Sequence, residues 1–108
     1  MDARRRRDAV EIKYAILKAG VNGQKKTRIM YQSSLNMKQL NLHLEELVLN
    51  DLISYQPTGR YFTTTERGKA FTKMFENYRE TSDLLTEQER ALERFLTSRS
   101  KKPLGVAA

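Results

Sequence analysis

Three basic side chains fall close together in the first third of the chain. Lys25, Lys26 and Arg28 lie at the beginning of a short predicted helix. Cations at a helix N-terminus oppose the helix macrodipole, so local stability does not explain this group. A phosphate bound from outside would explain it. The alternative interpretation is a run of charge that only contacts solvent.

A second group of polar side chains falls at the beginning of the next predicted helix. Side-chain amides can make paired hydrogen bonds to adenine, and lysine can reach guanine or phosphate. The residues of this kind are Asn36, Lys38, Gln39 and Asn41. Each of them alone would also fit the solvent-facing side of any helix. Together with the basic group, they predict a surface that binds nucleic acid.

Three further sites have two interpretations each. Arg60 follows a turn and could contact phosphate or the minor groove, or be an ordinary turn residue. Arg4 to Arg7 form either a basic arm along DNA or a solubilising helix start. His43 fits a structural, hydrogen-bonding role better than a catalytic one.

The elements that would position these groups form a helix-turn-helix followed by a β-wing. Helices are predicted over residues 4–19, 27–33 and 37–50, and Asn36 is expected to cap the third. Strands are predicted over Ile53–Gln56 and Arg60–Thr63. The apolar stripe of the third helix is predicted to be Met37, Leu40, Leu44, Leu47 and Val48, and the turn of the wing is predicted to be Pro57-Thr58-Gly59.

The segment from Thr65 to about Arg99 has the pattern of one long helix. Its apolar residues alternate at steps of three and four, which is a heptad seam. The seam consists of Phe71, Met74, Tyr78, Thr81, Leu85, Gln88, Leu92 and Phe95, of which the six apolar members are the predicted dimerisation residues. A helix of this length needs a partner, so a homodimer is expected. A competing signal is the capping box Thr86-Glu87-Gln88-Glu89, which could restart the helix after a break near Ser82-Asp83.

These patterns predict an α+β, mainly helical fold. The domains are expected to be a winged helix-turn-helix over residues 1–68, a dimerisation helix over 69–99 and a disordered tail over 100–108.

Composition and charge limit the class of protein. The chain has 108 residues with 20 basic and 13 acidic side chains, and residues 1–69 hold 13 of the basic and 7 of the acidic ones. This surplus favours a polyanionic partner, which is first of all double-stranded DNA. The absence of cysteine, the single histidine and the lack of a long apolar run argue against a metal site and a membrane span. A cytoplasmic, nucleoid-associated protein is expected.

No pattern in the sequence predicts catalysis. The sequence contains no phosphate-cradling glycine loop, no nucleophile–base pair and no metal-ligand spacing. Neither a cofactor nor a small-molecule substrate is therefore predicted. The main alternative is a protein-interaction module of the transcription or replication machinery that leaves its groove-facing surface unused. The acidic pair Glu45 and Glu46 would favour that alternative if it lay toward the DNA. An RNA-binding role is weaker, because no aromatic stacking platform is expected on the strands.

Several segments together resemble an archaeal family of small winged-helix DNA-binding proteins. The resemblance covers about residues 8–80, and the segments that carry it are Thr27–Tyr31, Leu35–Leu40, Leu44–Leu47, Tyr61 and Thr65–Lys69. The family includes a short dimeric chromatin-associated type, called "ten-a", from thermoacidophilic archaea, and transcription regulators with the same domain. Two positions depart from its pattern: His43 stands where the family more often has tyrosine, and the capping box lies within the coiled-coil segment.

The resemblance implies a winged helix-turn-helix whose C-terminal helices pair as an antiparallel coiled coil. The dimer would then present two DNA-binding faces. The positions that match the DNA-facing surface of the family are Lys25, Lys26, Thr27, Arg28, Asn36, Lys38, Gln39, Asn41 and Arg60.

Overall fold

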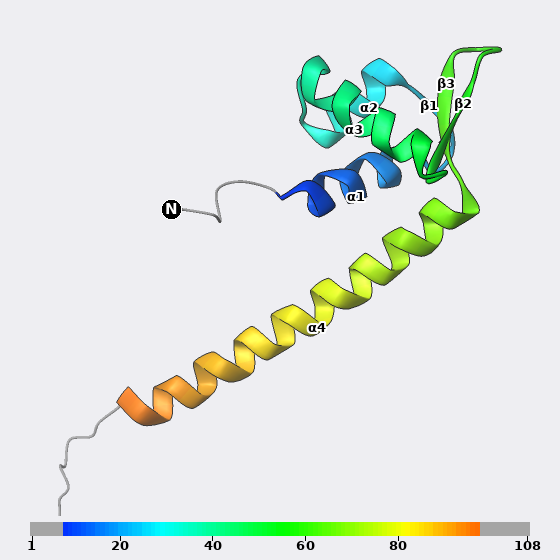
Figure 1. The fold of residues 1–108 in the computed structure, drawn as a ribbon. Helices are drawn as coiled ribbons and strands as arrows, with labels where there is room; N and C mark the ends of the chain where they lie inside the picture. The colour runs from blue at the N-terminus through cyan, green and yellow to red at the C-terminus, as the bar shows by residue number, and fades with distance from the viewer. Residues whose placement is uncertain (1–7, 98–108) are drawn as a thin grey trace, which may run out of the picture. The chain divides into compact units, whose positions relative to one another are not determined.

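The computed structural model describes residues 8–97, which contain four helices and three short strands (Figure 1). Along the chain these are α1 (Ala9–Ala19), β1 (Gln24–Lys25), α2 (Lys26–Ser33), α3 (Met37–Leu49), β2 (Ile53–Gln56), β3 (Tyr61–Thr64) and α4 (Glu66–Thr97). The chain divides into two compact units between Phe75 and Glu76, and α4 contributes residues to both. The mainly helical winged-helix fold predicted from the sequence is therefore confirmed.

Helix α1 begins later than the sequence pattern predicts. Asp8 has an extended backbone, and its carboxylate accepts a hydrogen bond of 2.8 Å from the backbone N–H of Glu11, so the helix begins at Ala9 and not at residue 4. The proposed basic arm, Arg4 to Arg7, lies outside the described residues. The fully buried residues of α1 are Ile16 and Leu17.

Hydrogen bonds define both ends of the turn between α2 and α3. Ser34 has a left-handed backbone with φ of 57°, and the N–H of Leu35 donates to the carbonyl of Met30, as in a Schellman ending. Asn36 then caps α3 as predicted. Its side chain accepts from the N–H of Gln39, while the side chain of Gln39 accepts from the N–H of Asn36, which together form a capping box.

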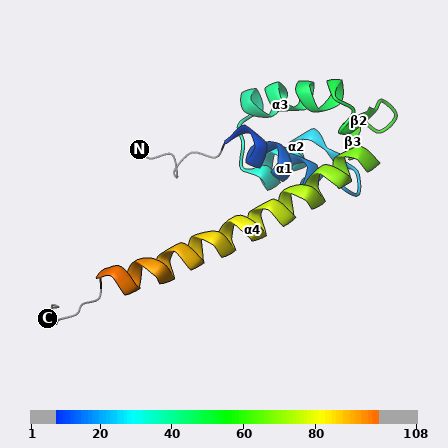
Figure 2. The same cartoon turned by 60° about the horizontal axis from the view of Figure 1, so that its bottom comes forward.

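The core of the first unit is formed by all three N-terminal helices and the wing (Figure 2). Its fully or nearly fully buried apolar members are Ile16, Leu17, Ile29, Leu40, Leu44, Leu47 and Ile53. The predicted stripe of α3 is right at its centre but wrong at its ends, because Met37 and Val48 are 39% and 44% exposed. The buried residues of α3 are therefore Leu40, Leu44 and Leu47.

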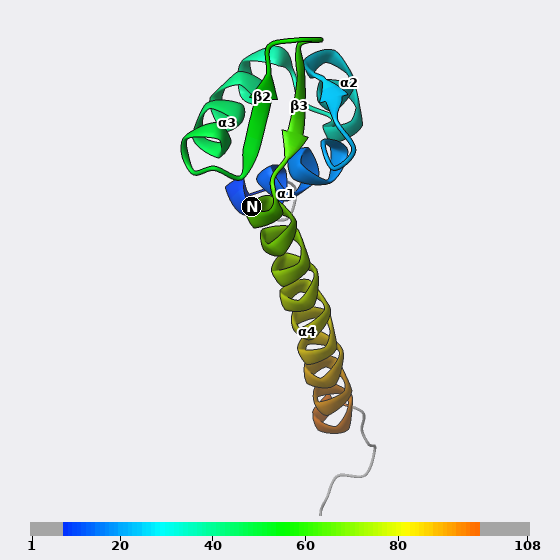
Figure 3. The same cartoon turned by 90° about the vertical axis from the view of Figure 1, so that its right-hand side faces the viewer.

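The wing contains one more strand than predicted. The sheet order is β1-β3-β2, with both pairings antiparallel, and Gln24 and Lys25 of β1 face Phe62 and Tyr61. Figure 3 shows β2 on the side of α3 and β3 on the side of α2. The prediction for β2 is confirmed, whereas β3 begins at Tyr61, one residue later than predicted. The reason is that Arg60 has a left-handed backbone with φ of 53° and belongs to the turn.

Helix α4 begins at a threonine cap, as the sequence indicated. The hydroxyl of Thr65 accepts a hydrogen bond of 3.0 Å from the N–H of Gly68 and donates to the carbonyl of Asp51. The helix is continuous to Thr97, so the predicted single long helix is confirmed and the alternative break near Ser82-Asp83 is absent. Thr86 donates its hydroxyl to the carbonyl of Ser82 and is an interior residue of the helix rather than a cap.

Candidate nucleic-acid interface

The N-terminus of α2 concentrates positive charge. Lys25 has an extended backbone at the N-cap position but makes no capping hydrogen bond with its side chain, and the first turn contains no acidic residue. Lys26 and Arg28 follow within that turn. Lys25 and Arg28 are exposed and Lys26 is half-buried. The unpaired backbone N–H groups and the lysine and arginine side chains thus combine to attract an anion.

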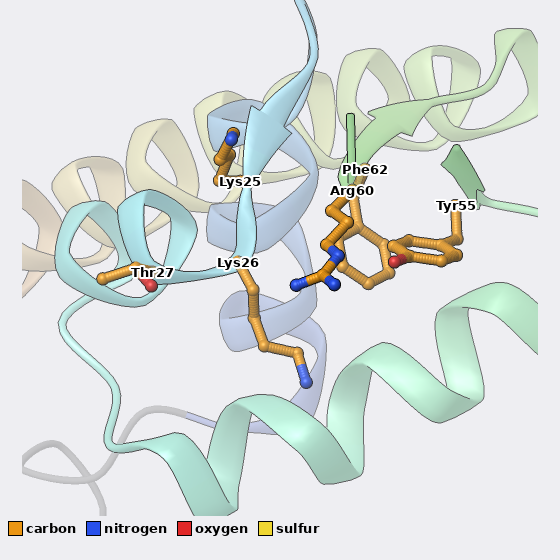
Figure 4. Close-up of a pocket in the computed structure, with 6 residues that line it drawn as sticks. All are labelled: Lys25, Lys26, Thr27, Tyr55, Arg60 and Phe62. Atoms are coloured by element: carbon orange, nitrogen blue, oxygen red, sulfur yellow. The ribbon is translucent and has the colours of Figure 1, made fainter. Parts of the chain in front are cut away.

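The turn of the wing brings Arg60 to the same place. The N–H of Arg60 donates to the carbonyl of Pro57 at 3.2 Å, which closes the turn. A pocket of about 500 Å³ is lined by Lys25, Lys26, Thr27, Tyr55, Arg60 and Phe62. In Figure 4 the side chains of Arg60 and Lys26 reach toward the same space, and the rings of Tyr55 and Phe62 lie beside Arg60. Four of the predicted DNA-binding residues therefore meet in one pocket.

The predicted base-contacting residues all lie on the exposed side of α3 or at its cap. Asn36, Lys38, Gln39 and Asn41 are exposed. The capping box uses the side-chain oxygens of Asn36 and Gln39, so these two residues have a structural role in addition to any contact with a ligand. Asn41 belongs to a second pocket of about 470 Å³, which is mostly apolar and is lined by Lys26, Asn41, Leu44, Glu45, Val48, Leu49 and Phe62. Lys26 and Phe62 line both pockets and connect them.

An aromatic pair on the wing was missed by the sequence analysis. Tyr55 on β2 and Phe62 on β3 are cross-strand partners, and their ring centroids are 4.9 Å apart with an angle of 45° between the planes. Tyr55 is 44% exposed. The predicted turn of Pro57 to Gly59 would have made Tyr61 the partner of Tyr55. Because the turn also includes Arg60, the register shifts by one residue and Tyr55 faces Phe62 instead. The sequence analysis expected no aromatic platform on the strands and did not identify this pair.

His43 has the structural role that was predicted. Lys13 of α1 lies 3.0 Å from Nδ1 of His43 and 2.7 Å from Oε1 of Glu46, both on α3. Partial burial and the nearby Lys13 ammonium lower the pKa of His43, and the carboxylate of Glu46 opposes this effect. The hydrogen bond and positive charge of Lys13 lower the pKa of Glu46. The cluster thus joins α1 to α3 and leaves His43 neutral at pH 7.

The predicted dimerisation residues divide into two kinds. Phe71 is half-buried and packs against the core of the first unit. The other five are strongly exposed, with exposed fractions of 72% for Met74, 67% for Tyr78, 56% for Leu85, 65% for Leu92 and 83% for Phe95. Leu84 and Leu96 are also exposed. The later part of α4 therefore carries exposed apolar side chains.

Residues 8–97 offer neither a membrane-spanning helix nor a cluster of metal ligands. None of the helices there has the length and apolarity that crossing a membrane requires. In the same part of the chain, no group of three or more His, Cys, Asp or Glu side chains is placed to hold a metal ion.

Comparison with known proteins agrees with this architecture. A family model described as winged helix-turn-helix matches residues 6–83. Among solved structures, the chain is similar to the crystal structure of Sso10a-2, a DNA-binding protein from Sulfolobus solfataricus, with a TM-score of 0.78 and 22% sequence identity. That match covers 88% of this chain and 100% of the other. The search of curated proteins finds no match.

The resemblance to archaeal winged-helix proteins is thus confirmed by a family match over most of the chain and by a solved archaeal structure of the same fold. The chain belongs to the winged helix-turn-helix family.

Proposed function

We propose that this protein is a homodimer that binds double-stranded DNA, as a transcription regulator or as an architectural protein of chromatin in the cytoplasmic nucleoid. One observation carries the proposal: the basic end of α2 and Arg60 of the wing converge beside the exposed side of α3. The similarity to Sso10a-2, a DNA-binding protein, and the winged-helix family support a binding role rather than catalysis.

In this proposal the basic residues position the protein on the DNA backbone. Lys25, Lys26 and Arg28, together with Thr27, contact phosphates at the N-terminus of α2, where backbone N–H groups also favour an anion. Arg60 contacts phosphate or the minor groove from the wing. Such contacts carry no sequence information, but they account for most of the affinity.

Base readout is assigned to α3. The second helix of a helix-turn-helix lies in the major groove, and its N-terminal residues meet base edges. Lys38 and Asn41 are exposed there and take no part in the capping box. The capping box uses only the side-chain oxygens of Asn36 and Gln39, so their amide N–H groups remain available as donors. Leu42 is 60% exposed on the same helix and could contact a thymine methyl.

Dimerisation is assigned to the heptad seam of α4, in residues 69–99, while residues 1–68 form the DNA-binding domain. A helix of 32 residues is about 48 Å long, and its later part exposes Leu85, Leu92 and Phe95. Pairing with the same helix of a second copy, in an antiparallel coiled coil, would remove these side chains from water. The proposed dimer would then have two DNA-binding faces.

The regulator is slightly favoured over the architectural protein. Exposed amides on α3 favour some base readout, whereas the small size of the chain favours an architectural role. The test is to measure binding of the purified protein to a promoter-containing duplex and to a random duplex across a salt series. A preference of about a hundredfold, which corresponds to about 2.7 kcal/mol, would identify a regulator. Equal and salt-sensitive binding would identify an architectural protein, and no binding at low salt would refute the proposal.

A second candidate function is a protein-interaction module. The apolar pocket beside α3 favours it, because Leu44, Val48 and Leu49 line that pocket together with the acidic Glu45. The charge reversals Arg28→Glu and Lys38→Glu distinguish the two functions. If DNA binding survives both reversals, the helix-turn-helix is not the contact surface.

A further inference from the structure

The pocket between the wing and α2 combines two kinds of chemistry that duplex binding does not require together. Lys26 and Arg60 supply positive charge, and Tyr55 and Phe62 supply aromatic rings. Phosphate contacts need only the cations. In an intact duplex the bases are stacked on one another, so their faces are not available to a protein side chain. The rings therefore need a different explanation.

Stabilisation of the hairpin explains only part of this arrangement. A cross-strand aromatic pair does stabilise a two-stranded ribbon. Phe62 fulfils this role, because it is half-buried and packs against the core. Tyr55 rests against Phe62 but is 44% exposed and lines a pocket of about 500 Å³. That volume is within the range of about 300–1,000 Å³ that is typical of sites for small ligands.

We propose that this pocket binds an unpaired nucleotide of a single-stranded nucleic acid, with the base stacked on Tyr55 and the adjacent phosphate held between Lys26 and Arg60. Aromatic stacking with cations along the backbone is the usual way in which proteins bind single strands without sequence preference. The backbone of the wing supports this geometry. Arg60 has a left-handed φ of 53°, and its side chain extends beside the two rings and toward Lys26 (Figure 4).

This inference shares its cations with the proposed duplex-binding surface and rests on that proposal for the phosphate contacts. Tyr55 belongs to the single-strand site alone. The protein would thus use one basic surface for two substrates, with duplex readout by α3 and capture of an unpaired base by the wing. A frayed end, a gap or a melted region of DNA would present both features at once.

The chain provides a matched control for Tyr55. Tyr61 is a second exposed tyrosine of the wing, with an exposed fraction of 38%, and it lines a different pocket together with Asn22, Gly23 and Thr63. Replacing Tyr55 by leucine keeps an apolar side chain but removes the stacking ring. Replacing Tyr61 by leucine makes the same chemical change outside the proposed site.

The experiment measures the affinity of the full chain and its variants for short oligothymidylate and for a duplex. Loss of one stacked base weakens binding by about tenfold, so Tyr55→Leu is expected to bind oligothymidylate about tenfold more weakly. Tyr61→Leu and Tyr55→Phe are expected to bind it as the unchanged protein does. Duplex affinity is expected to be the same in all four proteins. Equal affinity of Tyr55→Leu and the unchanged protein for oligothymidylate would overturn the inference.

Two further measurements identify what the pocket recognises. An oligomer of the same length with abasic sites keeps the phosphates and loses the bases, and we expect it to bind about as weakly as oligothymidylate binds to Tyr55→Leu. Equally tight binding of the abasic oligomer would overturn the stacking. Thymidine monophosphate tests whether a free nucleotide is enough to fill the pocket. If the protein bound it more tightly than oligothymidylate, the assignment of the pocket to a nucleic-acid strand would be overturned.

Tyrosine fluorescence gives a direct readout of stacking. The chain has five tyrosines and no tryptophan, so a base stacked on one tyrosine quenches a measurable share of the signal. Quenching by oligothymidylate should be lost in Tyr55→Phe although this variant still binds. If the protein binds the single strand but not the duplex, only the proposed function is refuted. If it binds the duplex but not the single strand, only this inference is refuted.

Discussion

The ammonium group of Lys13 on α1 lies 2.7 Å from the carboxylate of Glu46 on α3, and the same ammonium lies 3.0 Å from Nδ1 of His43. Because the lysine nitrogen is a donor, Nδ1 of His43 must accept, which requires a neutral imidazole with its proton on Nε2. One cation thus fixes the protonation state of a residue on the proposed DNA-reading helix.

This cluster makes the stability of the domain sensitive to acid. Burial and Lys13 hold the folded-state pKa of His43 below its usual value of 6.5. The unfolded chain then binds a proton more readily than the folded one, so the contribution of His43 is fully present above pH 6.5 and is lost as the pH falls below it. The lowered pKa of Glu46 has the same sign, with a loss that begins below its usual 4.5.

Thermal unfolding measured between pH 7.5 and pH 5 checks this prediction, with pH values chosen to bracket the ordinary pKa of about 6.5 for histidine. We expect the melting temperature to fall as the pH decreases through this range. The variant His43→Gln, which cannot titrate, should lose this dependence and keep the decrease at lower pH that is due to Glu46. If it retained the full decrease above pH 5, another group would be responsible.

The capping box predicts a stability effect at Asn36 and Gln39, two residues of the proposed DNA-binding surface. Asn36→Ala removes the side-chain oxygen that accepts from Gln39, and such losses cost about 1 kcal/mol of folding free energy. Asn36→Ser keeps an acceptor and should be close to neutral. Urea unfolding measures both. A neutral Asn36→Ala variant would mean that the cap contributes nothing to folding stability.

Most of the helix-turn-helix could be predicted from the sequence because its signals are local. Asn36 before an apolar stripe, Asn50-Asp51 after it, and Thr65 before Glu66 are capping signals that depend on neighbours in the chain, and each is where the structure has a helix boundary. The end of strand β2 could also be predicted from a local signal, because the turn residues Pro57 to Gly59 follow it directly.

Features that depend on distant parts of the chain could not be predicted in this way. Strand β1 has only two residues, and it exists because Gln24 and Lys25 pair with Phe62 and Tyr61. The pocket at the end of α2 arises from the same pairing, which brings Arg60 to Lys26. The cluster of Lys13, His43 and Glu46 joins two helices whose relative placement no local pattern specifies.

Gly68 provides a test of how tightly the beginning of α4 packs on Leu52. It is buried, and a Cβ at this position would collide with the carbonyl oxygen of Leu52 and lie 2.6 Å from Cγ2 of Thr64. Helix propensity alone predicts that Gly68→Ala stabilises, because glycine is unfavourable within helices. The collision predicts the opposite sign, with a loss of about 1–3 kcal/mol.

Chemical denaturation of Gly68→Ala decides between these signs. Lys73→Ala, an exposed change in the same helix, serves as the control and should shift stability by less than about 0.5 kcal/mol. A stabilised Gly68→Ala variant would show that α4 can move away from Leu52 at little cost.

The heptad seam predicts the effect of charge on assembly. Leu85 and Leu92 are exposed along α4, and replacing both by lysine would place like charges opposite each other in the proposed coiled coil. We expect the unchanged protein to sediment as a dimer and the seam variant to sediment as a monomer. The control is Thr86→Lys with Thr97→Lys, which adds the same charge to α4 outside the seam. A seam variant that stays dimeric would locate the interface elsewhere.

The basic end of α2 predicts a change in the salt dependence of DNA binding. Each phosphate contact that is lost lowers the slope of log affinity against log salt by roughly 0.9, so alanine at Lys25, Lys26 and Arg28 together should lower it by about 2–3. The preference for one sequence over another should remain, because phosphate contacts do not read bases. Asn41→Ala should do the reverse, with an unchanged slope and a loss of about 1–3 kcal/mol in discrimination. Lys73→Ala removes one charge from α4 and should change neither quantity. An unchanged slope in the triple variant would mean that the α2 cations lie away from the DNA.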